Sequence, residues 1–238
     1  MKAIIFAAGL GSRLKPLTDH TPKALLKVNG KPLLAHAIEK LQQVGVTEII
    51  VNVHHLAEQV VLWLENNHYH GVTFSISDER DLLLDTGGGL KKAAAFFNDD
   101  QPFFAYNADI LTDLNLSEMM NFHCKHHALA TLAVSERATA RYLLFDNAKR
   151  LKGWTNIKTG ETIPQNIDVE RLKKTAFSGI HIIDPKLLYL LNKEDAFPII
   201  PEYLRLCSEH SIIGYDHTGN YWMDMGKPEA FAAERERE

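Results

Sequence analysis

Short apolar runs alternate with stretches of helical periodicity over the first half of the chain. The first run, residues 2–7, is continuous and ends near a glycine, which is typical of a strand buried on both faces. Similar runs predict strands over residues 47–53, 72–77 and 102–106. Apolar residues at helical spacing predict helices over residues 32–44, 56–64 and 89–97. This alternation predicts an α/β, Rossmann-like fold, in which helices flank a mixed, mostly parallel sheet.

The pattern is less regular in the second half. It predicts strands over residues 129–134, 142–146 and 175–183, and short helices over residues 186–191 and 199–207. Residues 212–215 and 221–223 are expected to form a closing hairpin, and the polar residues 158–174 a long loop. The chain has neither an internal repeat nor a low-complexity linker, so residues 1–238 are expected to form a single domain.

Composition excludes some classes of protein. A formal net charge of −4 argues against binding to nucleic acid. No stretch approaches the roughly 20 apolar residues of a membrane helix, and the apolar start is too short for a signal peptide. Cys124 and Cys207 fit no metal spacing and are expected to be buried free thiols, which favours a cytoplasmic protein.

The segment after the first strand is the strongest candidate for chemistry. Its glycines would let the backbone approach a ligand closely, so that N–H groups cradle phosphate, and three cations follow at Arg13, Lys15 and Lys23. A dinucleotide-binding loop is disfavoured because Leu14 stands where its third glycine would be. A P-loop would need Gly-Lys-Ser or Gly-Lys-Thr, which the chain lacks. A tight turn with incidental charge remains the alternative to phosphate binding.

Two of these cations have a specific use against a triphosphate. The planar guanidinium of Arg13 suits the β- and γ-phosphates and the charge on leaving pyrophosphate. Lys23 would place a compact positive charge near the α-phosphate, and Pro22 restrains the backbone just before it.

Acidic residues provide a candidate metal site. Asp109 follows the strand at residues 102–106, and the carboxyl ends of parallel strands meet at one edge, so it should face the same crevice as the glycine loop. A carboxylate there could hold Mg²⁺, or it could simply cap a turn. Asp113 is expected to cap a helix. Asp224 lies in an apolar, aromatic stretch, and either a shared metal ion or a buried ion pair would account for it.

A second glycine cluster, residues 85–89, precedes a predicted helix. Three consecutive glycines would let the backbone lie against a base or sugar, although Asp85 alone would suit a helix cap. Gly179 lies within a strand-like run, where glycine often marks a closely approaching ligand. Neither a Ser-His-Asp nor a Cys-His arrangement can be identified.

These segments together resemble the signature of the sugar nucleotidylyltransferases. The resemblance begins with residues 9–13, 16–18 and 22–23 and continues through 85–88, where Glu is more usual than Asp85. It extends to residues 107–109, 177–180 and 222–226, so it covers nearly the whole chain. Many members carry a C-terminal left-handed β-helix, which is not expected here.

The resemblance implies direct in-line transfer of a nucleotidyl group from a nucleoside triphosphate to a sugar 1-phosphate. It implies that residues 1–113 bind the nucleotide and residues 114–238 the sugar, with Mg²⁺ as the cofactor. Arg13 and Lys23 would be catalytic, and Asp109 and Asp224 would hold the metal. The nucleotide contacts would be Ala8, Gly9, Gly11, Ser12, Arg13, Lys23, Thr86, Gly87 and Gly88. The sugar contacts would be Asn107, Gly153, Ser178 and Gly179.

The motifs look closest to short stand-alone N-acetylmuramate-1-phosphate uridylyltransferases. The alternatives are a mannose-1-phosphate guanylyltransferase and a non-catalytic sensor of nucleotide sugars. Neither nucleic acid nor membrane is expected as a partner, and the protein is expected to be a monomer or a small homo-oligomer.

Overall fold

The first half of the chain forms the parallel part of one large sheet. The computed structural model describes residues 1–235. The strands of this part run in the order β6-β1-β4-β5, and all three pairings are parallel. Their bounds are β1 Lys2–Phe6, β4 Glu48–Val53, β5 Thr73–Asp78 and β6 Phe103–Asn107. The helices between them are α1 Leu33–Gln42, α2 Ala57–Asn66 and α3 Asp85–Lys92.

Helices cover both faces of this sheet because its inner strands, β1 and β4, are apolar on both sides. In β1, Ala3 and Ile5 belong to a core shared with α1 and α2, whereas Ile4 belongs to a second core shared with α3. A strand buried on both faces reads as a continuous apolar run, which is how residues 2–6 read. The predicted α/β fold, with a mixed, mostly parallel central sheet flanked by helices, is confirmed.

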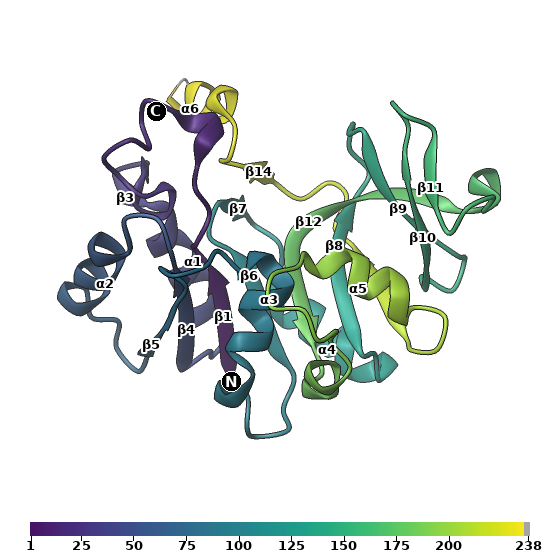
Figure 1. Ribbon diagram of the computed structural model, residues 1–238, viewed down its shortest axis with the longest axis horizontal. Helices are drawn as coiled ribbons and strands as arrows, with labels where there is room; N and C mark the ends of the chain where they lie inside the picture. Colours follow the sequence, from purple (N-terminus) through teal and green to yellow (C-terminus); the bar gives the residue numbers. More distant parts are fainter. Residues whose placement is uncertain (236–238) are drawn as a thin grey trace.

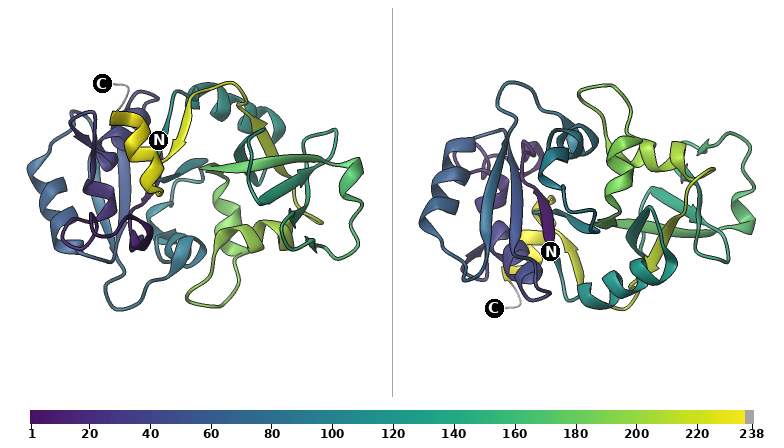
Figure 2. Two further views of the ribbon diagram at one scale, coloured as in Figure 1. Left: turned by 90° about the horizontal axis from the view of Figure 1, so that it is seen from above. Right: turned by 90° about the horizontal axis from the view of Figure 1, so that it is seen from below.

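The second half extends the same sheet with mostly antiparallel pairings. The long strand β12, Lys173–Ile183, pairs with β6 and joins the two halves. The other strands of this half are β8 Ala130–Ser135, β9 Arg141–Phe145, β10 Leu151–Asn156, β11 Glu161–Ile163 and β13 Ile212–Asp216. Two helices, α4 Leu116–His126 and α5 Ile199–Leu206, pack beside them. The two halves form two lobes that β12 connects (Figures 1 and 2).

The end of the described chain returns to the first lobe, so the predicted closing hairpin is wrong. Strand β13 pairs in parallel with β8, whereas β14, Trp222–Asp224, pairs with β7, Ile110–Thr112. Helix α6, Pro228–Arg235, follows and lies over the short strands β2, Lys27–Val28, and β3, Lys31–Pro32 (Figure 1). A small apolar cluster holds it there, built from Val28, Leu33, Leu111, Met225 and Ala230. Residues 222–235 therefore belong spatially with the first half.

Four local expectations are corrected. Asp113 does not cap α4, because the cap is Asn115, whose side chain accepts the Glu118 N–H at 3.2 Å. The expected loop at 158–174 includes β11, which pairs with β10. Helix α3 begins at Asp85 rather than at residue 89. The helix expected at 186–191 is a short 3₁₀ helix over Pro185–Tyr189.

Two further findings bear on the surroundings of the protein. The thiols are free but not buried as expected, since Cys124 is exposed and Cys207 half-buried. None of the helices in residues 1–235 is both long and apolar enough to span a bilayer.

Candidate active site

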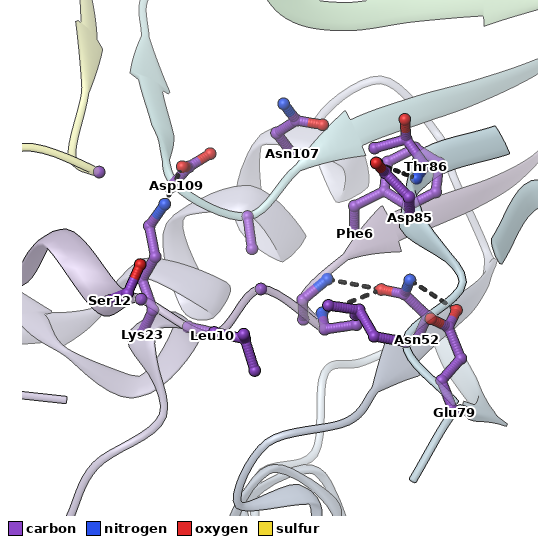
Figure 3. Close-up of a pocket in the computed structure, with 18 of the residues that line it drawn as sticks. Phe6, Leu10, Ser12, Lys23, Asn52, Glu79, Asp85, Thr86, Asn107 and Asp109 are labelled. Atoms are coloured by element: carbon purple, nitrogen blue, oxygen red, sulfur yellow. Dashed lines mark hydrogen bonds and ion pairs between the residues drawn. The ribbon is translucent and has the colours of Figure 1, made fainter. Parts of the chain in front are cut away.

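A cavity of about 610 Å³ opens at the carboxyl ends of β1 and β6. The glycine loop that follows β1 forms one wall, and Asp85 and Thr86 at the start of α3 form another (Figure 3). Residues 196–198, which precede α5, also line the cavity. The structure thus brings the glycine loop and Asp109 to one crevice, as the sequence predicts from the common edge of parallel strands.

The glycine loop leaves space and N–H groups for a ligand. A Cβ built on Gly9 would meet no atom within 4 Å, so protein packing does not require a glycine there. Gly11 has a φ of +64°, and a Cβ on it would lie 2.7 Å from the methyl group of Thr18. Within the described residues, the N–H groups of Gly9, Leu10 and Gly11 have no protein acceptor. These are the properties expected of a phosphate-binding loop.

Lys23 and Asp109 form an ion pair at the edge of the cavity (Figure 3). Lys23 begins a 3₁₀ helix over Lys23–Leu25, and Asp109 lies in the turn between β6 and β7. Only 15% of the Lys23 side chain and 18% of the Asp109 side chain are exposed. Because solvent screens the pair only weakly, its charges act strongly on any ligand in the cavity.

Asp224 and Arg13 converge on the same place. The Asp224 carboxylate accepts the Gly226 N–H at 2.8 Å, and the Met225 N–H donates to the Asp109 carbonyl at 2.9 Å. A Cβ on Gly226 would lie 2.8 Å from Asp224 Oδ1 and from Lys23 Nζ, and 2.9 Å from an Arg13 nitrogen. Two cations and the Asp224 carboxylate therefore lie around Gly226, and the Asp109 carboxylate joins them through its ion pair with Lys23. Asp224 is only half-buried rather than enclosed in an apolar core.

This arrangement suits a magnesium ion bound together with phosphate. The two carboxylates balance the two cations, so the site offers no net positive charge to a triphosphate, which carries several negative charges. Carboxylate and phosphate oxygens are the ligands that Mg²⁺ prefers. Within residues 1–235, no three His, Cys, Asp or Glu side chains are grouped to hold a metal ion by themselves. Asp109 and Asp224 could therefore hold Mg²⁺ if the substrate supplied the remaining oxygen ligands.

The second glycine cluster packs against protein rather than opening to the cavity. The N–H groups of Gly87 and Gly88, predicted to contact the nucleotide, donate to the Phe197 carbonyl at 2.8 and 3.1 Å. A Cβ on Gly87 would lie 2.3 Å from the Phe197 ring, and one on Gly88 would lie 2.1 Å from the Asp195 carbonyl. The prediction for these two glycines is corrected, because close packing of residues 195–197 on α3 accounts for them. Thr86 does line the cavity.

The predicted sugar-side residues divide into two groups. Asn107 lines the cavity, and its buried Oδ1 has no hydrogen-bond partner within the described residues. Gly179, with a φ of +77°, lies against Asn107, since a Cβ on it would be 3.0 Å from the Asn107 amide nitrogen. Ser178 is fully buried and its hydroxyl is hydrogen-bonded to His217 at 2.7 Å, so it stabilises β12 and does not line the cavity. Gly153 is corrected, because it packs against the Ile163 carbonyl and does not line the cavity.

Sequence reasoning missed several residues of the cavity wall. Asn52 and Glu79 are almost completely buried beneath the glycine loop, at 3% and 1% exposure. Asn52 was detectable as the one polar side chain inside an otherwise apolar strand, residues 49–53. Phe197 could not be predicted from the sequence, because it reaches the cavity only through the fold that packs it on α3.

Comparison with known proteins identifies the family. The sequence model of the nucleotidyl transferase family matches residues 2–237. The chain belongs to this family. A mannose-1-phosphate guanyltransferase of Candida albicans is 31% identical over 97% of this chain, and one of Yarrowia lipolytica is 30% identical over the same share. The chain spans 62% of the length of each of these relatives.

Two solved structures are similar to this chain in fold. HddC from Yersinia pseudotuberculosis is 21% identical with a TM-score of 0.78, over 99% of this chain and 98% of that one. A putative glucose-1-phosphate thymidylyltransferase from Bacillus anthracis is 20% identical with a TM-score of 0.81, over 100% of this chain and 94% of that one. The family resemblance inferred from the motifs is confirmed.

Proposed function

We propose that this nucleotidyl transferase joins a nucleoside triphosphate to a sugar 1-phosphate and releases pyrophosphate. The observation that carries this proposal is the convergence of Arg13, Lys23, Asp109 and Asp224 around Gly226, beside a cavity with unpaired N–H groups. A protein that only sensed a nucleotide sugar would have no need for two cations and two carboxylates at one point.

In the proposed reaction, a phosphate oxygen of the sugar 1-phosphate attacks the α-phosphorus of the nucleotide. The bond between the α-phosphorus and its bridging oxygen breaks, and pyrophosphate leaves in line with the attack. Lys23 stabilises the negative charge that builds on the α-phosphate, and Arg13 stabilises the leaving pyrophosphate. Asp109 and Asp224 would hold Mg²⁺, which supplies positive charge against the phosphates when it is bound. The N–H groups of Gly9, Leu10 and Gly11 bind phosphate, and Ala8 and Ser12 flank them in the lining of the cavity.

The nucleotide and the sugar are assigned to different parts of the cavity. The glycine loop and Thr86 contact the nucleotide, and Asn107 with Gly179 faces the sugar. The unpartnered Asn107 Oδ1 supports this assignment, because a buried acceptor gains a hydrogen bond when a sugar hydroxyl donates to it.

Among the substrates, we favour GTP and mannose 1-phosphate. Relatives that are about one-third identical over nearly the whole chain are mannose-1-phosphate guanyltransferases. They favour this alternative over the N-acetylmuramate-1-phosphate uridylyltransferase that the motifs suggested first.

The test is pyrophosphate release from a matrix of GTP, UTP, CTP and dTTP against several sugar 1-phosphates, with and without Mg²⁺. We expect the greatest release from GTP with mannose 1-phosphate, and only with the metal present. Release from UTP with N-acetylmuramate 1-phosphate would keep the reaction and overturn the choice of substrates. If no combination released pyrophosphate while a nucleotide sugar still bound to the protein, the proposed function would be overturned.

A further inference from the structure

A buried amide–carboxylate pair lies beneath the cavity and takes no part in the proposed reaction. The Asn52 Oδ1 atom accepts the N–H groups of Ala7 at 2.7 Å and Ala8 at 3.2 Å. Its Nδ2 donates to Glu79 Oε1 at 2.8 Å (Figure 3). The other Glu79 oxygen accepts the Leu84 N–H at 3.2 Å. The hydrogen bonds run without a break from the start of the glycine loop to the start of α3.

This chain of hydrogen bonds joins four segments that the backbone does not join directly. Ala7 and Ala8 follow β1, Asn52 is in β4, Glu79 follows β5, and Leu84 immediately precedes α3. Helix α3 also packs on the pair, since a Cβ on Gly89 would lie 2.7 Å from Glu79 Oε1 and 3.0 Å from Asn52 Nδ2. The two walls of the cavity are therefore held apart at a distance that this pair sets.

The pair also determines which backbone groups remain for a ligand. Because Asn52 accepts the N–H groups of Ala7 and Ala8, the first unpaired N–H of the loop is that of Gly9. A carboxylate as deeply buried as that of Glu79 is costly unless it is hydrogen-bonded, and burial raises its pKa. Asn52 and Glu79 are buried polar side chains in an otherwise apolar core, so apolar packing does not explain why they are there.

We propose that Asn52 and Glu79 are positioning residues of the nucleotide site. They fix the glycine loop relative to Asp85 and Thr86, so that phosphates and base are bound at one defined separation, and they do not touch the reacting atoms. The inference rests on the proposed function for its kinetic consequences, although the hydrogen-bond chain can be tested without it.

The test is to reverse the polarity of the pair. In Asn52→Asp two carboxylates would face each other with no donor between them, and both cannot stay ionised. In the double variant Asn52→Asp/Glu79→Gln, the new amide can donate to the new carboxylate. That carboxylate still accepts from Ala7 and Ala8, and the carbonyl oxygen of the new amide accepts from Leu84. The double variant thus restores every hydrogen bond, and donor and acceptor are exchanged only in the bond between the two side chains.

We expect Asn52→Asp to raise KM for the nucleotide by about 10- to 100-fold, as expected for loss of buried hydrogen bonds, and the double variant to return within about 3-fold of the original. KM for the sugar phosphate should change by less than about 2-fold, because Asn107 and Gly179, which are proposed to face the sugar, lie outside the hydrogen-bond chain. Glu79→Gln alone, which keeps the Asn52 bonds to the loop, should give a smaller effect and remains informative if Asn52→Asp does not fold.

The matched control is a second amide–carboxylate pair outside the cavity. Asn192 donates to Glu202 Oε1 at 3.1 Å, and its N–H donates to Glu202 Oε2 at 3.0 Å. Asn192→Asp should lower the melting temperature and leave KM for the nucleotide unchanged. If Asn52→Asp behaves in the same way, or if the folded double variant fails to recover, the proposal is overturned.

Amide hydrogen exchange separates this proposal from the proposed function. In Asn52→Asp the amides of residues 7, 8 and 84 should exchange faster, and in the double variant their protection should return. Recovered protection together with inactivity of the original protein on every substrate would overturn the proposed function and retain the link between the walls. Unchanged exchange in a fully active Asn52→Asp would overturn the link and retain the function.

Discussion

The two glycine-rich segments of this protein look alike in sequence and differ in the structure. The first segment follows β1 and the second lies at the start of α3. The sequence predicts that both contact a ligand. At Gly9 a Cβ would meet empty space, whereas at Gly88 it would lie 2.1 Å from a backbone carbonyl. The N–H groups of Gly9, Leu10 and Gly11 in the first segment have no protein acceptor within the described residues, and those of Gly87 and Gly88 are bonded to Phe197.

The difference separates two reasons for keeping a glycine. A glycine that borders open space in a cavity leaves room for a ligand, and one that is tightly enclosed leaves room for the protein itself. A substitution at Gly9 should therefore alter catalysis with little effect on stability, and one at Gly88 should do the reverse. Single substitutions in each segment can test this contrast.

The largest effect is expected where the first segment meets the charged residues. Lys23→Ala should lower turnover by at least about 100-fold, because it removes a preorganised charge from the proposed transition state. Asp109→Ala should produce a loss of the same order. The measurement is the rate of pyrophosphate release at saturating substrates, with circular dichroism as the check on folding. Near-normal rates in both folded variants would remove these residues from the mechanism.

The second prediction concerns stability. Gly88→Ala would force a methyl group against the Asp195 carbonyl, which is backbone and cannot move aside as a side chain would. We expect a loss of about 3 kcal/mol in the free energy of unfolding, at the upper end of the range for overpacking. Denaturant titration measures it. A fully stable variant with a raised nucleotide KM would mean that Gly88 serves the ligand after all.

Gly9→Ala is the matched substitution in the first segment. Its methyl group would enter the space that the nucleotide is proposed to fill, so KM for the nucleotide should rise by about 10-fold, or ~1.4 kcal/mol. The free energy of unfolding should change by less than about 0.5 kcal/mol, as is usual for a site without packing contacts. Loss of stability with unaltered KM would reverse the assignment of the two segments.

The sequence predicts well what depends on local pattern. Strands β1, β4, β5 and β6 lie within a few residues of their predicted ranges. Strands β1, β4 and β6 are short apolar runs buried on both faces, whereas β5 is a largely exposed strand at the edge of the sheet. The meeting of Asp109 with the glycine loop follows from the common edge of parallel strands.

It predicts poorly what depends on contacts distant in the chain. The pairing of β14 with β7 joins residues more than one hundred positions apart, and no local pattern encodes it. Helix α4 escapes prediction because one of its core positions is His123, which pattern analysis counts as polar. In the structure His123 is buried and hydrogen-bonds Thr131 at 2.9 Å, and burial lowers its pKa to about 4. A buried neutral histidine thus completes an apolar face.

The smallest expected effect extends the contrast from glycines to a polar atom. Asn107 Oδ1 is buried and accepts from no described protein group, just as Gly9 has space that no described protein atom fills. If a sugar hydroxyl donates to it, Asn107→Ala should raise KM for the sugar phosphate by about 5-fold, the usual worth of one neutral hydrogen bond. KM for the nucleotide should stay constant. Ser178 lies on the neighbouring strand but is bonded to His217, so Ser178→Ala should instead lower stability and leave KM for the sugar phosphate unchanged. Equal kinetic effects of the two substitutions would mean that an unpartnered buried acceptor does not mark a ligand contact in this site.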